Sequence, residues 1–231
     1  MTCAICNERR EKRFCPAVHG KICPQCCGEQ REVTLDCPSE CPYLQQAREH
    51  GNAHHQSRAE RDDDDNDREK LFPEVEITEQ FLLEREHLIL GLSFALGKSA
   101  RADRSLRDRD LITAVSSLAK SYRTLVNSSL IYIYEPPTAN VAHQSIAREV
   151  ETMVREFREA EQQHLGEIPG HARLRDSDVL KALVFLLRMA FARTSGRPKS
   201  RGFIDFLFAQ FPEKQSALAG PEEAGSRIVI P

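Results

Sequence analysis

The sequence has little of what exported and membrane-spanning proteins carry. Its most apolar segment, residues 179–192, is too short to cross a bilayer and is interrupted by Lys181 and Arg188. The first ten residues contain no apolar stretch of the length that a signal peptide needs. We therefore expect a cytoplasmic protein that makes no use of a membrane.

Motifs that identify common enzymes are also missing. The chain contains no Gly-x-Ser-x-Gly, no phosphate-binding glycine loop and no His-Glu-x-x-His. A di-metal bundle site needs a Glu-x-x-His pair on the inward faces of two helices. Glu161 with His164 has this spacing, whereas Glu84, Glu86 and His87 are expected on a polar helix face. We assign no catalytic residue and favour a non-enzymatic protein, although a helical bundle can hold a site that no motif reveals.

Cysteine is absent after residue 41, and all eight cysteines lie in the first fifth of the 231 residues. Clustered cysteines in a reducing compartment are more often metal ligands or redox centres than disulfides. A stretch of 43 residues buries too little apolar surface to fold unaided, so bound metal would supply most of its folding free energy. The sequence predicts two structural zinc ions, bound by Cys3, Cys6, Cys15, Cys23, Cys26, Cys27, Cys37 and Cys41.

Three other interpretations of these cysteines compete with structural zinc. Cys23-Pro24-Gln25-Cys26 has the form of a thioredoxin-type redox pair, but too few residues precede it for the strand and helix that frame such a pair. A zinc deaminase needs proline before its Cys-x-x-Cys, and Ile22 occupies that position. An iron–sulfur cluster could use four of the thiols. Pairs of thiols separated by short loops favour tetrahedral zinc.

The run from Arg13 to Cys26, preceded by Cys3-Ala4-Ile5-Cys6, resembles the B-box zinc fingers of tripartite-motif proteins. The resemblance implies a cross-braced arrangement of two ions. One ion would be bound by Cys3, Cys6, Cys23 and Cys26, and the other by Cys15, Cys37, Cys41 and a fourth ligand. We favour Cys27 as that ligand because it completes eight thiolates, and His19 is the alternative.

The remainder of the chain divides into three parts. Residues 44–72 are polar, with aspartates concentrated at 62–67, and are expected to form a flexible, acidic linker. Residues 73–211 are expected to form an all-α bundle of about five helices, because apolar residues recur there at helical spacing and no strand-rich section is found. Residues 212–231 are expected to be a flexible tail.

Apolar stripes place the five predicted helices at residues 77–95, 111–125, 146–160, 179–192 and 203–211. The fourth is apolar nearly all round and should lie at the centre of the bundle, capped by Asp176 and Asp178. Because module 1–43 and the bundle bury separate cores, we expect a chelator to unfold the module and to leave the helices largely intact.

Charge favours a protein partner over nucleic acid. The chain has a net charge of −3, and residues 1–43 contain six basic and six acidic residues before any thiolate is counted. We expect the zinc module to dock a protein through loops 7–14 and 28–36, with the bundle able to self-associate. The alternative is a nucleic-acid-binding regulator that uses basic clusters 9–13 and 193–201.

Overall fold

The computed structural model describes residues 2–58, 73–129, 131, 141–164 and 173–212. Within these residues it contains eight α-helices and one two-stranded sheet, where the sequence predicted about five helices. The elements of the first 58 residues are β1 (Arg13–Cys15), η1 (Pro16–Val18), β2 (Gly20–Ile22), α1 (Pro24–Gln30) and α2 (Pro42–Arg58). Those that follow are α4 (Glu79–Glu84), α5 (Glu86–Ala102), α6 (Asp108–Ser128), α7 (Val141–His164), α8 (Asp176–Arg193) and α9 (Gly202–Gln210).

One predicted helix is two in the structure. The stripe expected over residues 77–95 is interrupted at Arg85, whose φ of −116° and ψ of 20° lie outside the helical region. At this break Arg85 pairs with Glu161 at 3.4 Å and with Asp178 at 3.0 Å, so the guanidinium joins α4 to α7 and α8. An apolar stripe continues across such a break, which is why the pattern did not reveal it.

The first part of the expected linker is helical. Residues 44–58 belong to α2, which packs against α8 of the bundle. Leu44 is 1 % exposed and anchors this otherwise polar helix. Residues 59–72 of the expected linker and 213–231 of the expected tail lie outside the described part of the chain.

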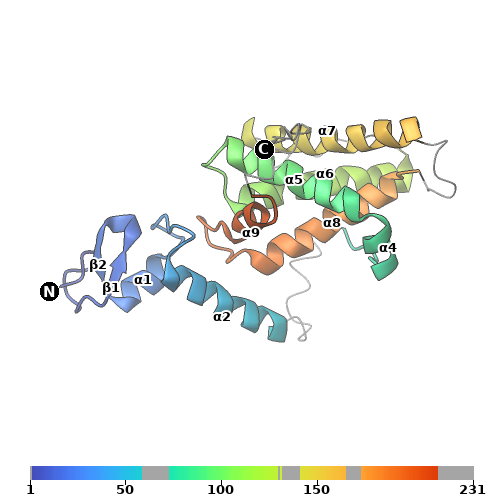
Figure 1. Cartoon of the computed structure of the whole chain (residues 1–231). Helices are drawn as coiled ribbons and strands as arrows, with labels where there is room; N and C mark the ends of the chain where they lie inside the picture. Colours follow the sequence, from blue (N-terminus) through green and yellow to red (C-terminus); the bar gives the residue numbers. More distant parts are fainter. Residues whose placement is uncertain (1, 59–72, 130, 132–140, 165–172, 213–231) are drawn as a thin grey trace, which may run out of the picture.

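The bundle core forms where α6 packs against α8 and α5 packs against α7 (Figure 1). Helix α8 also contacts α2, α5 and α9, in agreement with the central position expected from its apolar composition. Its first turn is capped by Asp178, whose carboxylate accepts a hydrogen bond from the Arg175 amide at 3.2 Å. Among the described residues, no helix is long and apolar enough to cross a membrane.

The N-terminal module lies at one end of the molecule and has an apolar cluster of its own (Figure 1). Strands β1 and β2 form an antiparallel hairpin in which Arg13 is opposite Ile22 and Cys15 is opposite Gly20. Ile22 is fully buried among the cysteines of this cluster. The module therefore contains a small core that is distinct from the core of the bundle.

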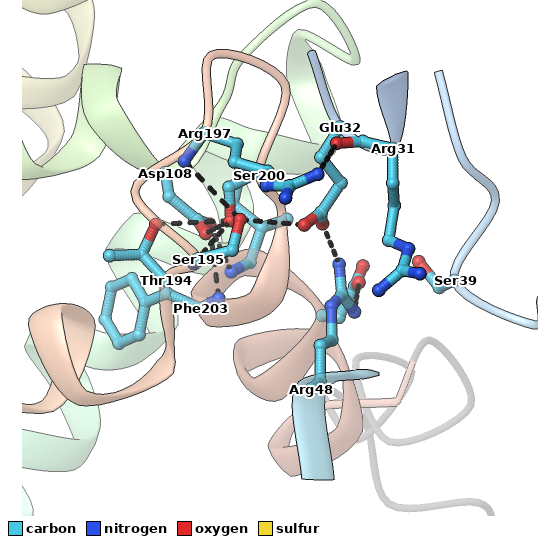
Figure 2. A network of polar contacts seen from close by, with 12 residues as sticks. Arg31, Glu32, Ser39, Arg48, Asp108, Thr194, Ser195, Arg197, Ser200 and Phe203 are labelled. Carbon is cyan, nitrogen blue, oxygen red and sulfur yellow. Dashed lines mark hydrogen bonds and ion pairs between the residues drawn. The ribbon is translucent and has the colours of Figure 1, made fainter. Parts of the chain in front are cut away.

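The module is nevertheless tied to the bundle through a polar network centred on Glu32 (Figure 2). The Glu32 carboxylate is 2 % exposed and accepts hydrogen bonds from Arg48 at 2.8 Å and from the Ser195 hydroxyl at 2.7 Å. Arg48 also pairs with Asp205 of α9 at 2.6 Å. We call this set the Glu32 junction, and it comprises Glu32, Arg48, Ser195, Arg197, Lys199 and Asp205.

The basic loop between α8 and α9 completes the junction. The Arg197 guanidinium donates to the carbonyl oxygens of Gly28 at 2.8 Å and Arg31 at 2.6 Å. The Lys199 ammonium donates to the Thr34 carbonyl at 2.5 Å, and the Lys199 amide donates to the Glu32 carbonyl at 2.8 Å. These cations therefore satisfy carbonyl groups in the last turn of α1 and in the loop that follows it.

Candidate metal centre

Four of the predicted ligands come together in the structure. The Sγ atoms of Cys3, Cys6, Cys23 and Cys26 all lie within 4.8 Å of one another. In a tetrahedral site with zinc–sulfur bonds of about 2.3 Å, the sulfur atoms are about 3.8 Å apart. The cluster is therefore close to the geometry of a bound metal ion, and these four residues are the set that the sequence assigned to the first ion.

The first cysteine pair is held by backbone hydrogen bonds. The Asn7 amide donates to the Cys3 carbonyl at 2.9 Å and closes a tight turn around Cys6. Asn7 has a φ of 55°, a left-handed conformation that asparagine tolerates better than most residues. The Ala4 amide donates to the Lys21 carbonyl at 3.0 Å, which places this turn beside β2 and the second cysteine pair.

The second pair lies at the start of α1. Cys23 is the N-cap of this helix, and its sulfur accepts a hydrogen bond from the Cys26 amide at 3.4 Å. Pro24 follows at the first helical position, where its missing amide hydrogen leaves no group unpaired. Because Cys23 and Cys26 are three residues apart on one helical turn, their thiols face the same side.

Amide groups directed at the sulfur atoms favour thiolates. Amides of Arg9 and Glu8 lower the pKa of the Cys6 thiol to about 6. Burial acts to raise the pKa of Cys3, but amides of Cys6, Cys23 and Ile5 outweigh it and the net shift is downward. Burial, together with the neighbouring cysteines, raises the pKa of Cys26 to about 12. A bound cation would oppose the upward shift at Cys26 and favour its thiolate.

Arg9 supplies part of the positive charge around the cluster. A hydrogen bond with Cys6 raises the pKa of the Arg9 guanidinium, and the charges of Cys23 and Cys26 act in the same direction. Arg13, the first residue of β1, stacks over the Tyr43 ring at 4.6 Å. Two members of basic cluster 9–13 thus have roles within the module.

The environment of the cluster indicates what a bound metal could do. Cys3, Cys23 and Cys26 are buried and Cys6 is half-buried. Four protein sulfurs fill a tetrahedral coordination sphere and leave no position for water or substrate. A metal ion held here would act as a structural centre that closes the turn, the hairpin and α1 on one another.

The ligand atoms of the remaining predicted ligands do not form a second group as close as the first, among the described residues. Cys15, Cys27 and Cys41 are buried and Cys37 is half-buried. Burial raises the pKa of Cys37, and the charges of Cys15 and Cys41 act in the same direction. Within the described residues, however, the first set is the one whose ligand atoms lie within bonding range of a common ion. The second ion remains a prediction, as does the choice between Cys27 and His19.

His19 and Cys27 have different surroundings. His19 is exposed at the end of η1, with a φ of 49°. Cys27 is 8 % exposed and lies in α1, within the apolar cluster of the module. Two other histidines, His50 and His87, are exposed on different helices, α2 and α5. The side chains of His54, His55 and His164 lie outside the described part of the chain.

The structure also assigns a role to loop 28–36 that the sequence did not reveal. This loop was expected to recognise a partner, and its carbonyls and the Glu32 carboxylate instead contact the bundle. Buried Asp108 was not singled out either, although it accepts hydrogen bonds from Ser200 at 2.7 Å and from the first amides of α9. A single acidic residue gives no sequence signal for such a role.

No family model, curated protein or solved structure matches the chain. The four-cysteine cluster agrees with the first ligand set implied by the B-box resemblance but does not identify that family, because many small metal-binding modules contain four such cysteines. The function must therefore be argued from the chain's own residues.

Proposed function

We propose that the chain is a non-enzymatic, zinc-dependent interaction protein whose N-terminal module docks a protein partner. The observation that carries the proposal is the closed four-cysteine cluster beneath the β1–β2 hairpin. Zinc is the metal that best suits four thiolates in a tetrahedral, redox-inactive site. Bound zinc would hold the hairpin in one conformation for recognition.

The outward surface of the hairpin supports a protein partner. Phe14 is 58 % exposed on β1, and Val18 is 37 % exposed at the end of η1. The hairpin lies at the opposite end of the molecule from α4 and is directed away from the bundle (Figure 1). Exposed aromatic residues on a rigid element are typical anchors of protein interfaces.

The contacts of the basic loop favour this proposal over nucleic-acid binding. Arg197 and Lys199 donate hydrogen bonds to carbonyl oxygens of the module. Arg193 stacks over the Phe206 ring at 3.6 Å. Cations used in this way present fewer free donors to phosphates than the sequence suggested.

A comparison of two variants tests the proposal. Phe14→Ser removes the exposed ring of the hairpin, and Leu83→Ser removes an exposed side chain from α4, where Leu83 is 78 % exposed. After affinity capture from lysate, we expect a protein that is retained by the wild type and Leu83→Ser and lost from Phe14→Ser. Zinc content, measured by elemental analysis, should be the same in all three.

Two results would count against the proposal. Equal capture by Phe14→Ser and the wild type would show that the hairpin is not the contact. Loss of the captured protein after nuclease treatment would favour the nucleic-acid alternative, because the contact would then depend on bridging RNA or DNA.

A further inference from the structure

A cleft of about 720 Å³ lies between the module and the bundle, apart from the cysteine cluster and the Glu32 junction. Residues 36–40 of the module form one wall, and the other wall consists of the α5–α6 connection with side chains of α9 and the loop before it. Its volume is within the range of pockets that hold small ligands. Its charged lining residues are Arg101, Arg104, Arg107, Arg201, Asp36 and Glu40, and we call it the arginine cleft.

The arginine cleft has a surplus of positive charge, with four guanidinium groups against two carboxylates. In the described part of the chain, Arg107 is the cleft arginine paired with a carboxylate, and it contacts Asp36 at 3.0 Å. Arg201 donates to the carbonyls of Arg104 at 2.8 Å and Leu106 at 3.3 Å, which are neutral acceptors. Arg101 donates to the Phe211 carbonyl and lies 4.9 Å from the centre of the Phe208 ring.

Local structure positions the Arg201 guanidinium and the backbone that carries Arg104 before any ligand arrives. Asp103 accepts hydrogen bonds from the Ser105 amide at 2.8 Å and from its hydroxyl at 2.6 Å, which orders the turn that carries Arg104. The carbonyls that hold Arg201 belong to the same turn. Fixed guanidinium groups lose little conformational entropy on binding, and their planar donors match phosphate oxygens.

We propose that the arginine cleft binds a small anion that carries two or more phosphoryl groups. The Arg101 and Arg201 guanidiniums have neutral partners and Arg104 is exposed, so these three groups call for an anion of more than one charge. Phosphoryl oxygens are the acceptors that arginine binds best. A small ligand is favoured over nucleic acid because Asp36 and Glu40 line the same cleft, where they would repel a strand that continued beyond it.

The test measures binding of inorganic tripolyphosphate to the full-length protein by calorimetry, at constant ionic strength. Arg104→Gln is the main variant, because Arg104 is exposed and its side chain makes no hydrogen bond or ion pair with the described residues. Arg109→Gln is the matched control, since Arg109 is exposed on the first turn of α6 and does not line the cleft. We expect saturable binding that weakens about tenfold in Arg104→Gln and is unchanged in Arg109→Gln.

A third variant should shift affinity in the opposite direction. Asp36→Asn releases Arg107 from its carboxylate partner, so tripolyphosphate should bind roughly threefold more tightly. Thermal unfolding of each variant without ligand shows whether the fold is retained, and bound anion should raise the midpoint.

Three outcomes would overturn the proposal. The first is no saturable binding of tripolyphosphate, and the second is equal affinity in Arg104→Gln and Arg109→Gln. The third is binding of a single-stranded oligonucleotide much more tightly than tripolyphosphate, with loss of that binding in Arg104→Gln, because the cleft would then be a nucleic-acid contact.

Discussion

The Arg48 guanidinium lies 2.8 Å from the Glu32 carboxylate and joins two segments that the sequence places in different parts of the protein. Glu32 belongs to the cysteine-rich module, and Arg48 belongs to the helix that replaces the first part of the expected linker. Glu32 adopts a φ of 53°, which is uncommon for a residue with a side chain. Its backbone thus accepts strain that allows the carboxylate to contact Arg48 and Ser195 together.

The ion pair predicts a large effect of Arg48→Ala. Glu32 is 2 % exposed, so the variant leaves a buried carboxylate without a cation. We expect the free energy of unfolding to fall by about 3 kcal/mol, at the lower end of values for broken buried pairs because Ser195 still donates to Glu32. Urea denaturation followed by circular dichroism measures this loss.

Two further variants control for the interpretation. Arg109→Ala removes an exposed arginine and should change stability by less than about 0.5 kcal/mol. Adding Glu32→Gln to Arg48→Ala should restore part of the loss, since it removes the unpaired charge. A double variant no more stable than Arg48→Ala would contradict a specific ion pair.

Metal removal is expected to weaken the bundle as well as the module. From their separate cores, the two parts were expected to unfold independently. The Glu32 junction predicts coupling instead, because an unfolded module no longer offers the Gly28, Arg31 and Thr34 carbonyls to the basic loop. A chelator should therefore lower the thermal midpoint of the bundle by a few degrees, equivalent to about 1–2 kcal/mol.

Glu32→Ala tests whether the junction transmits this effect. In that variant the chelator should lower the bundle midpoint by less than in the wild type, because part of the coupling is already lost. Differential scanning calorimetry with and without chelator gives both values. An equal shift in the two proteins would mean that the metal acts on the bundle by another route.

Asp108 predicts a pH dependence of stability. Burial raises the pKa of the Asp108 carboxyl above its ordinary value of 3.8, although hydrogen bonds from Ser200 and α9 oppose the shift. The folded protein therefore binds a proton at Asp108 more tightly than the unfolded chain does. As pH falls from neutral toward this ordinary value, the wild type should gain stability relative to Asp108→Asn, which cannot titrate.

Asp108→Ala separates charge from hydrogen bonding at this position. It leaves the amides of Phe203 and Ile204 and the Ser200 hydroxyl without their acceptor. A loss of about 2–4 kcal/mol is expected, and Asp108→Asn should lose less because one amide oxygen remains. If both substitutions were equally harmful at every pH, the carboxylate would have a role beyond capping α9.

The first cysteine site could be predicted from the sequence because its determinants are local. Cys3 with Cys6 and Cys23 with Cys26 are close pairs, and one short hairpin brings the pairs together. The apolar composition of residues 179–192 likewise indicated a central helix, since a helix that is apolar nearly all round is stable only when other elements cover all of its sides.

The Glu32 junction and the arginine cleft could not be predicted in this way. Arg48 and Asp205 are 157 positions apart, and Arg197 and Gly28 are 169 positions apart. Charged residues give no periodic signal, so a chain with many arginines does not show which of them become buried. The helix break at Arg85 was not predicted because its partners, Glu161 and Asp178, are also far away in the sequence, with Glu161 76 positions from Arg85.

The second metal ion offers the most direct test of the predicted ligands. If Cys27 completes a site with Cys15, Cys37 and Cys41, the purified protein should hold two zinc ions per chain. Native mass spectrometry measures this number. A single ion would limit the module to the cluster of Cys3, Cys6, Cys23 and Cys26.

Cys27→Ser and His19→Ala then identify the fourth ligand of that second ion. A serine hydroxyl does not replace a thiolate at neutral pH, so Cys27→Ser should lower the zinc content from two ions to one, while His19→Ala should keep both. The reverse pattern would make His19 the ligand. Cys27, although only 8 % exposed, would then be a free thiol open to slow alkylation in the metal-loaded protein.

Because Cys26 and Cys27 are adjacent in α1, they could also exchange sites, and Cys26→Ser would then release the second ion in place of the first. The arrangement of Cys26 with Cys3, Cys6 and Cys23 in the structure argues against that exchange, and locating the emptied site by alkylation of its cysteines in each variant decides between the two.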